Sequence, residues 1–74
     1  MTVFTQHYRY CVIRDCAVAR LSLFDERGGE YWMEVPTDQR DGSGRIPWRE
    51  VRSAALDRIS DALRRGDEPG EVSG

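Results

Sequence analysis

Three segments in which apolar and polar residues alternate constrain the fold of this chain more than any other feature. They cover residues 3–13, 16–24 and 30–36, and a period of two predicts a β-strand in each. The connections are short, at residues 14–15 and 25–29, so both are expected to be hairpins, the second closed by Gly28 in the left-handed region. The sequence therefore predicts a three-stranded antiparallel β-meander.

The apolar positions also predict a register. A first hairpin centred between residues 14 and 15 would place Tyr8 opposite Leu21 and Cys11 opposite Val18. A second hairpin centred on residue 27 would place Leu21 opposite Met33. Directly opposite residues share a face of the sheet, and both pairings gather the apolar side chains on one face. We therefore expect Tyr8, Leu21 and Met33 to be buried in the core, together with Ile59 of the helix that follows.

One helix is predicted over residues 47–65, after a polar loop. Pro47 suits the first turn of a helix, and Gly66 suits the position just beyond its end. The apolar residues recur at helical spacing, as Trp48, Val51, Ala55, Leu56, Ile59, Ala62 and Leu63. The predicted fold class is α+β: a three-stranded antiparallel β-meander with one C-terminal amphipathic α-helix packed on one face (βββα).

Composition sets the domain organisation and the expected compartment. A chain of 74 residues, 39% of them hydrophobic, supports one small core, which we assign to a single domain at residues 1–66. Residues 67–74 (DEPGEVSG) are acidic and are expected to form a disordered tail. No signal peptide or membrane-length apolar run is present, so we expect a soluble cytoplasmic protein without a membrane partner.

Candidate chemical sites are weak. His7, Cys11 and Cys16 match no common zinc spacing, and four residues of strand separate His7 from Cys11 by about 13 Å, too far for a catalytic hydrogen bond. The loop at residues 40–45 (RDGSGR) lacks the lysine of a phosphate-binding loop. We expect no enzyme activity, cofactor, metal or small-molecule substrate. Arg52, inside the apolar stripe, is expected to pack on Trp48 and reach Asp38 or Asp41, or else to bind a ligand.

The face of the sheet opposite the helix offers a better candidate for function. A tryptophan flanked by arginines is typical of protein interfaces, and two neighbouring arginines would seek carboxylates. In the predicted register Arg9, Arg20 and Glu34 lie side by side there. Phe24 and Trp32 are expected to be exposed on the same face. The candidate partner-binding residues are Arg9, Val18, Arg20, Phe24, Trp32 and Glu34.

The sequence resembles known protein families in two respects. Residues 28–36 (GGEYWMEVP), a glycine-containing loop and then residues 49–51 (REV) at a helix start resemble the strand–proline–loop–helix run of HicB-like antitoxins over roughly half the chain, without that family's proline–aspartate and glycine–cysteine turn. The βββα order also resembles ethylene-response-factor-type DNA-binding domains and some integrase arm-binding domains. Those families read the major groove with Arg and Trp on a basic sheet, and Arg9, Arg20 and Trp32 would occupy comparable surface.

The sequence thus leads to two functional hypotheses. The first is a small non-enzymatic regulatory or adaptor protein that binds a protein partner, or forms a homo-oligomer, through the open face of its sheet. The alternative is a sheet-based DNA-binding accessory or antitoxin-like regulatory module. The net charge of −2 favours the first, because proteins that bind nucleic acid by bulk electrostatics are normally basic.

Overall fold

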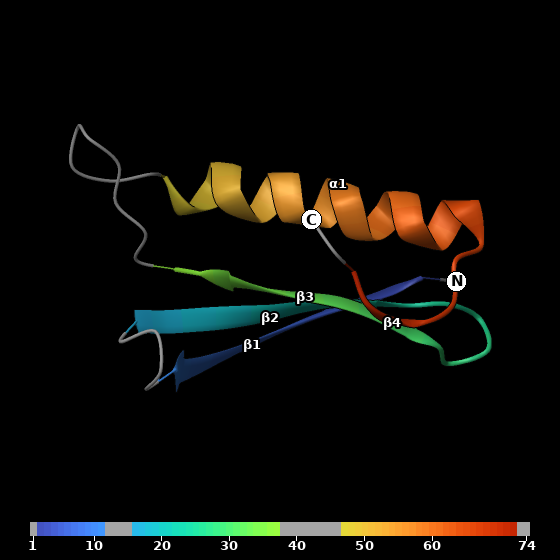
Figure 1. Ribbon diagram of the computed structural model, residues 1–74, viewed down its shortest axis with the longest axis horizontal. Coiled ribbons are helices and arrows are strands. Elements are labelled where there is room, and N and C mark those ends of the chain that lie inside the picture. The colour runs from blue at the N-terminus through green and yellow to red at the C-terminus, as the bar shows by residue number, and fades with distance from the viewer. Residues whose placement is uncertain (1, 12–15, 38–46, 73–74) are drawn as a thin grey trace.

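The architecture is a four-stranded sheet with one helix on one of its faces (Figure 1). The computed structural model describes residues 2–11, 16–37 and 47–72. Its elements are β1 (Val3–Cys11), β2 (Cys16–Phe24), β3 (Glu30–Pro36), α1 (Trp48–Arg65) and β4 (Gly70–Glu71). The sheet order is β1-β2-β3-β4, with β1 to β3 antiparallel and β4 parallel to β3. The predicted α+β fold is confirmed, with β4 as an addition.

The second hairpin has the predicted register. Leu21 lies opposite Met33. The turn between β2 and β3 is closed by a hydrogen bond from the Gly28 N–H to the Asp25 carbonyl, and Gly28 adopts a φ of 82°. The Asp25 carboxylate accepts the N–H groups of Arg27 and Gly29 at 2.9 and 2.7 Å. The sequence signal was strong here because the turn requires a glycine at this position.

The predicted register of the first hairpin is wrong by two residues. Tyr8 lies opposite Ala19 rather than Leu21, and Cys11 lies opposite Cys16 rather than Val18. A shift by two keeps every side chain on its predicted face, so the alternation of apolar residues could not distinguish the two registers. Turn length was the only remaining guide, and the structure places Cys11 and Cys16 opposite each other at the ends of β1 and β2.

The core lies between α1 and the two strands β2 and β3. Its buried members are Ala19, Leu21, Tyr31, Met33, Val35, Ala55, Ile59 and Ala62. Leu21, Met33 and Ile59 are buried as predicted, but Tyr8 is 63% exposed, so the prediction that it is buried is wrong. Tyr8 does face the helix side of the sheet, yet the helix packs mainly over β2 and β3, and its side chains that contact β1 leave Tyr8 largely exposed.

The end of the helix follows the sequence signals. Gly66 adopts a φ of 76°, which glycine tolerates without strain. The Gly66 N–H bonds to the Leu63 carbonyl and the Asp67 N–H to the Ala62 carbonyl, which is the double hydrogen bond of a Schellman motif. Within the described ranges, no helix has the length and apolar character needed to cross a membrane.

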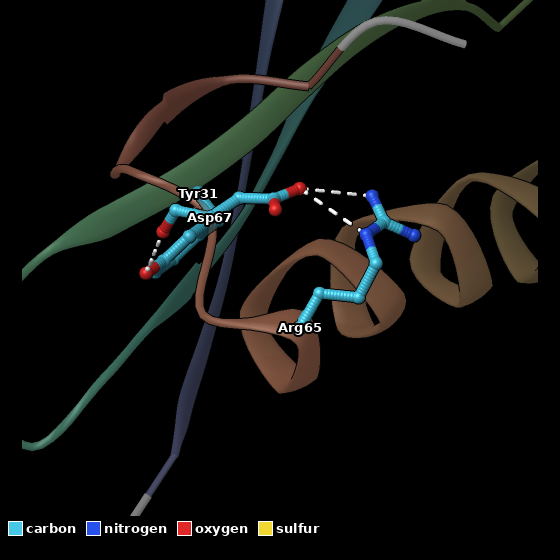
Figure 2. Close-up of polar contacts among 3 residues, drawn as sticks. All are labelled: Tyr31, Arg65 and Asp67. Carbon is cyan, nitrogen blue, oxygen red and sulfur yellow. Dashed lines mark hydrogen bonds and ion pairs between the residues drawn. The ribbon is translucent and has the colours of Figure 1, made fainter.

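The chain after the helix differs from the expected disordered tail. The Tyr31 hydroxyl donates a hydrogen bond of 2.8 Å to the Asp67 carbonyl, and Arg65 pairs with the Asp67 carboxylate at 2.9 Å (Figure 2). Further on, Gly70–Glu71 pairs with β3, and the Val72 N–H bonds to the Trp32 carbonyl at 2.8 Å. Besides these bonds, the Val72 side chain packs against the core, and none of these contacts follows a periodic pattern in the sequence.

The buried position of Ile59 leads to a first prediction. Ile59 is fully buried between the helix and the sheet, so Ile59→Ala should lower the free energy of unfolding by about 2–5 kcal/mol through lost burial and a residual cavity. Ser53→Ala, at an exposed position of the same helix, serves as the control and should change stability by about 0.5 kcal/mol or less. Urea denaturation of the three proteins measures both effects. Equal stabilities would contradict the packing of α1 described above.

Candidate interaction site

The face of the sheet opposite α1, called here the open face, carries the residues that the sequence selected. The corrected register changes their rows. His7, Arg20 and Glu34 lie side by side across β1, β2 and β3, whereas Arg9 lies opposite Val18. The two arginines are therefore diagonal neighbours and not the adjacent pair that the sequence predicted. Each of them has a glutamate partner.

One ion pair crosses the open face. The Arg9 Nε donates a hydrogen bond of 2.6 Å to the Glu34 carboxylate. Because Arg9 is on β1 and Glu34 on β3, this pair spans β2, which lies between those strands. Val18, directly opposite Arg9 on β2, is only 1% exposed. An apolar residue next to the ion pair is thus buried on a face that lacks a helix in the described part of the chain.

A second cluster surrounds Glu30. Its carboxylate accepts hydrogen bonds from the Ser22 hydroxyl at 2.7 Å and from Arg20 at 3.0 Å. The Arg20 guanidinium also stacks 3.9 Å from the centroid of the Trp32 ring. Ser22 is fully buried in this cluster, and Trp32 is half-buried. The hydrogen bond from Ser22, assisted by Arg20, lowers the pKa of Glu30 against the opposing effect of desolvation.

The candidate residues on the open face are therefore largely engaged with one another. Val18 is buried, and Arg20, Phe24, Trp32 and Glu34 are half-buried, while Arg9 keeps much of its surface exposed. Trp32 and Phe24 are less exposed than the sequence analysis expected. For Trp32 the reason is visible, since the guanidinium of Arg20 lies over its ring.

The exposed apolar surface lies instead on β1. All four large hydrophobic residues that are exposed within the described ranges belong to this strand: Val3 (51%), Phe4 (39%), Tyr8 (63%) and Tyr10 (59%). Phe4, Tyr8 and Tyr10 share the helix side of the sheet, because each pairs with a residue of β2 that faces α1. We call these three residues the aromatic strip. Sequence reasoning missed it because it assumed that one helix covers all three strands.

Two helix side chains reach the aromatic strip. The rings of Trp48 and Tyr8 are tilted, with centroids 6.4 Å apart. The Arg52 guanidinium lies 5.1 Å from the centroid of the Phe4 ring, and its Nε donates a hydrogen bond of 2.9 Å to the Gln6 side chain. Gln6 in turn bonds to the Tyr8 hydroxyl. Arg52 therefore has neutral partners on β1, while the predicted partners Asp38 and Asp41, like the loop at residues 40–45, lie outside the described residues.

The backbone of β1 adds a second feature to this surface. In an antiparallel sheet, successive residues of a strand direct their N–H and C=O groups to alternate sides. Hydrogen bonds from Thr37 to Ala17 and from Asp25 to Gly29 show that odd-numbered residues of β2 bond to β3. Even-numbered residues of β2 therefore bond to odd-numbered residues of β1. It follows that Phe4, Gln6 and Tyr8 direct their backbone groups away from β2, toward the outer edge of the sheet.

No protein-family model matches the chain, and the searches of curated proteins and of solved structures also found no match. Function must therefore be argued from the surface itself. Among the described residues, no three His, Cys, Asp or Glu side chains are grouped as metal ligands.

The cluster around Glu30 leads to a prediction about pH. A lowered pKa means that folded Glu30 holds its proton less than unfolded Glu30, so it stabilises the fold above its ordinary pKa near 4.5 and loses this effect as the pH falls through the lowered value. Glu30→Gln should therefore be less stable than the wild type at pH 7, and the difference should shrink below pH 4.5. Urea denaturation between about pH 3 and pH 7 measures this difference.

Ser22→Ala provides the matched control for that experiment. It removes the largest cause of the lowered pKa while keeping the carboxylate and Arg20, so the variant should depend less steeply on pH than the wild type. A stability difference between Glu30→Gln and wild type that stays constant over this pH range would contradict the assignment.

Proposed function

We propose that this protein is a small non-enzymatic regulatory or adaptor module that binds another protein chain, a different protein or a second copy, through its sheet, with β1 as the main contact. The observation that carries the proposal is the aromatic strip. Phe4, Tyr8 and Tyr10 are exposed on one face of a strand at the end of the sheet order. Aromatic residues are enriched at protein interfaces, where tyrosine combines a large contact area with a polar hydroxyl group.

The strand itself supports the proposal. β1 spans nine residues, and it lacks proline and carries one charged residue, Arg9. Native proteins usually protect a long edge strand with charges, proline or a covering element, because an outer edge can pair with another chain. An edge strand of this composition, with exposed aromatic side chains, suits addition of a further strand, with backbone bonds giving affinity and side chains giving specificity.

The open face has a secondary place in this proposal. Its arginines are paired with Glu34 and Glu30, and Val18 and Ser22 beside these pairs are buried. On this surface Val3 is exposed, whereas Phe24 and Trp32 are half-buried. The DNA-binding alternative also has less support, since carboxylates that neutralise Arg9 and Arg20 would repel phosphates.

The test compares the proteins captured from a host-cell extract by immobilised wild type and by Tyr8→Ser/Tyr10→Ser. Loss of two interface tyrosines should weaken association by about 2 kcal/mol or more, which is about 30-fold. Both tyrosines are exposed, so the variant should remain folded by circular dichroism.

Two matched variants locate the contact. Arg9→Ala tests the open face, and Arg58→Ala tests the exposed surface of the helix. Capture that is lost only with the tyrosine variant supports the proposal. Capture that is lost only with Arg9→Ala would move the contact to the open face, and equal capture by all four proteins would contradict a role for β1. Binding of DNA with a steep dependence on salt would favour the alternative instead.

A further inference from the structure

We infer that β1 pairs with β1 of a second copy of this chain, so that two four-stranded sheets join into one continuous sheet across a two-fold axis. This inference rests on the proposed function, because it names the occupant of the same strand. A two-fold axis perpendicular to a sheet makes the two edge strands antiparallel, and it brings identical surfaces into contact. The strand must therefore be complementary to its own reversed copy.

The sequence of β1 meets that requirement when the axis passes through His7. The nine residues Val3–Cys11 then overlap along their full length, since His7 is the middle residue. Phe4 lies opposite Tyr10 of the second copy and Gln6 opposite Tyr8. Aromatic residues face one another at both ends of the strip, and an amide faces a phenol near its centre, the same two groups that already hydrogen-bond within one chain. Pairs of this kind stabilise antiparallel strands.

Charge does not oppose this register. Arg9 is the one charged residue of β1, and it would lie opposite Thr5 of the second copy and not opposite another arginine. Its guanidinium is also paired with Glu34 of its own chain. Like charges directly opposite one another would destabilise a strand pair, and this register avoids them.

The backbone hydrogen-bonding groups of β1 that point to the outer edge match this register. Gln6 and Tyr8 direct their N–H and C=O groups toward the outer edge, as derived above from the pairing of β2. With the axis at His7, Gln6 of one copy lies opposite Tyr8 of the other, so each pair can exchange two hydrogen bonds. His7 bonds to β2 and therefore occupies the non-hydrogen-bonded site on the axis, where Cα atoms of opposite residues approach to about 4.5 Å.

The first experiment measures association of the full chain by sedimentation between about 1 µM and about 1 mM, the range of weak protein association. We expect a monomer–dimer equilibrium that Tyr8→Pro weakens at least about tenfold, because proline removes an edge-facing N–H and is tolerated on edge strands. Tyr8→Val keeps that N–H and strand propensity, so it should dimerise better than Tyr8→Pro. Dimers that Tyr8→Pro leaves unchanged would overturn the inference.

Amide hydrogen exchange gives a readout at single residues. The N–H groups of Gln6 and Tyr8 should gain protection as the protein concentration rises, whereas the His7 N–H, bonded within the chain, should be protected at both ends of the range. A chain that stays monomeric, while the tyrosine variant still loses a captured partner, overturns this inference and leaves the proposed function standing. A monomer with no such loss contradicts both.

A cross-linking pair tests the register. In the proposed dimer, residue 7 faces itself, so His7→Cys should form a disulfide between copies under mild oxidation. Thr5→Cys is the matched control on the same face: the two copies of residue 5 would be about 13 Å apart along the strands, beyond the reach of a disulfide. Peptide mass spectrometry identifies the linked residues. Equal linkage through residues 5 and 7 would contradict the register centred on His7.

Discussion

The width of one helix is the constraint on which the rest of this structure depends. An α-helix with its side chains is about 10 Å across, and neighbouring strands lie about 4.8 Å apart, so one helix covers about two strands. Here α1 packs over β2 and β3, and their apolar residues form the core with Ala55, Ile59 and Ala62. The outer strand β1 carries side chains of the same apolar pattern, and Trp48 and Arg52 of the helix contact it without covering it. Its aromatic residues are exposed for this geometric reason.

The presence of one helix in the described part of the chain also accounts for the polar contacts on the open face. In the described part of the chain no second helix covers that face, and its polar side chains take over part of the role. Arg9 and Glu34 reach across β2 above Val18, while Glu30 ties Ser22 to Arg20. Exposed ion pairs contribute little stability by themselves, typically up to about 1 kcal/mol. The methylene groups of long charged side chains, however, can cover apolar surface and exclude water from it. This matters in a small domain, which has few elements to cover both faces of a sheet.

How much of this could be predicted depends on the kind of signal that each element carries. The register of β2 with β3 was predictable because a turn of fixed length, closed by Gly28, specifies it uniquely. The register of β1 was not, since a shift by two residues preserves the pattern of faces. The two-residue strand β4 is held by its main chain and leaves no periodic pattern. The candidate site on the open face was chosen from residue types, and the network that occupies those residues depends on side-chain geometry.

The composition of β1 differs from that of a typical protected edge strand. Lysine is the most common protective residue, and this chain has none; proline and inward-facing charges are also lacking in the strand. The side chains that point to the helix side are aromatic, although α1 leaves that position open to solvent. A strand that remained at the edge would gain solubility from charged residues there, and it would lose no core packing, because the core lies over β2 and β3. Aromatic residues at these positions are therefore better explained by contact with another chain than by the needs of the isolated fold.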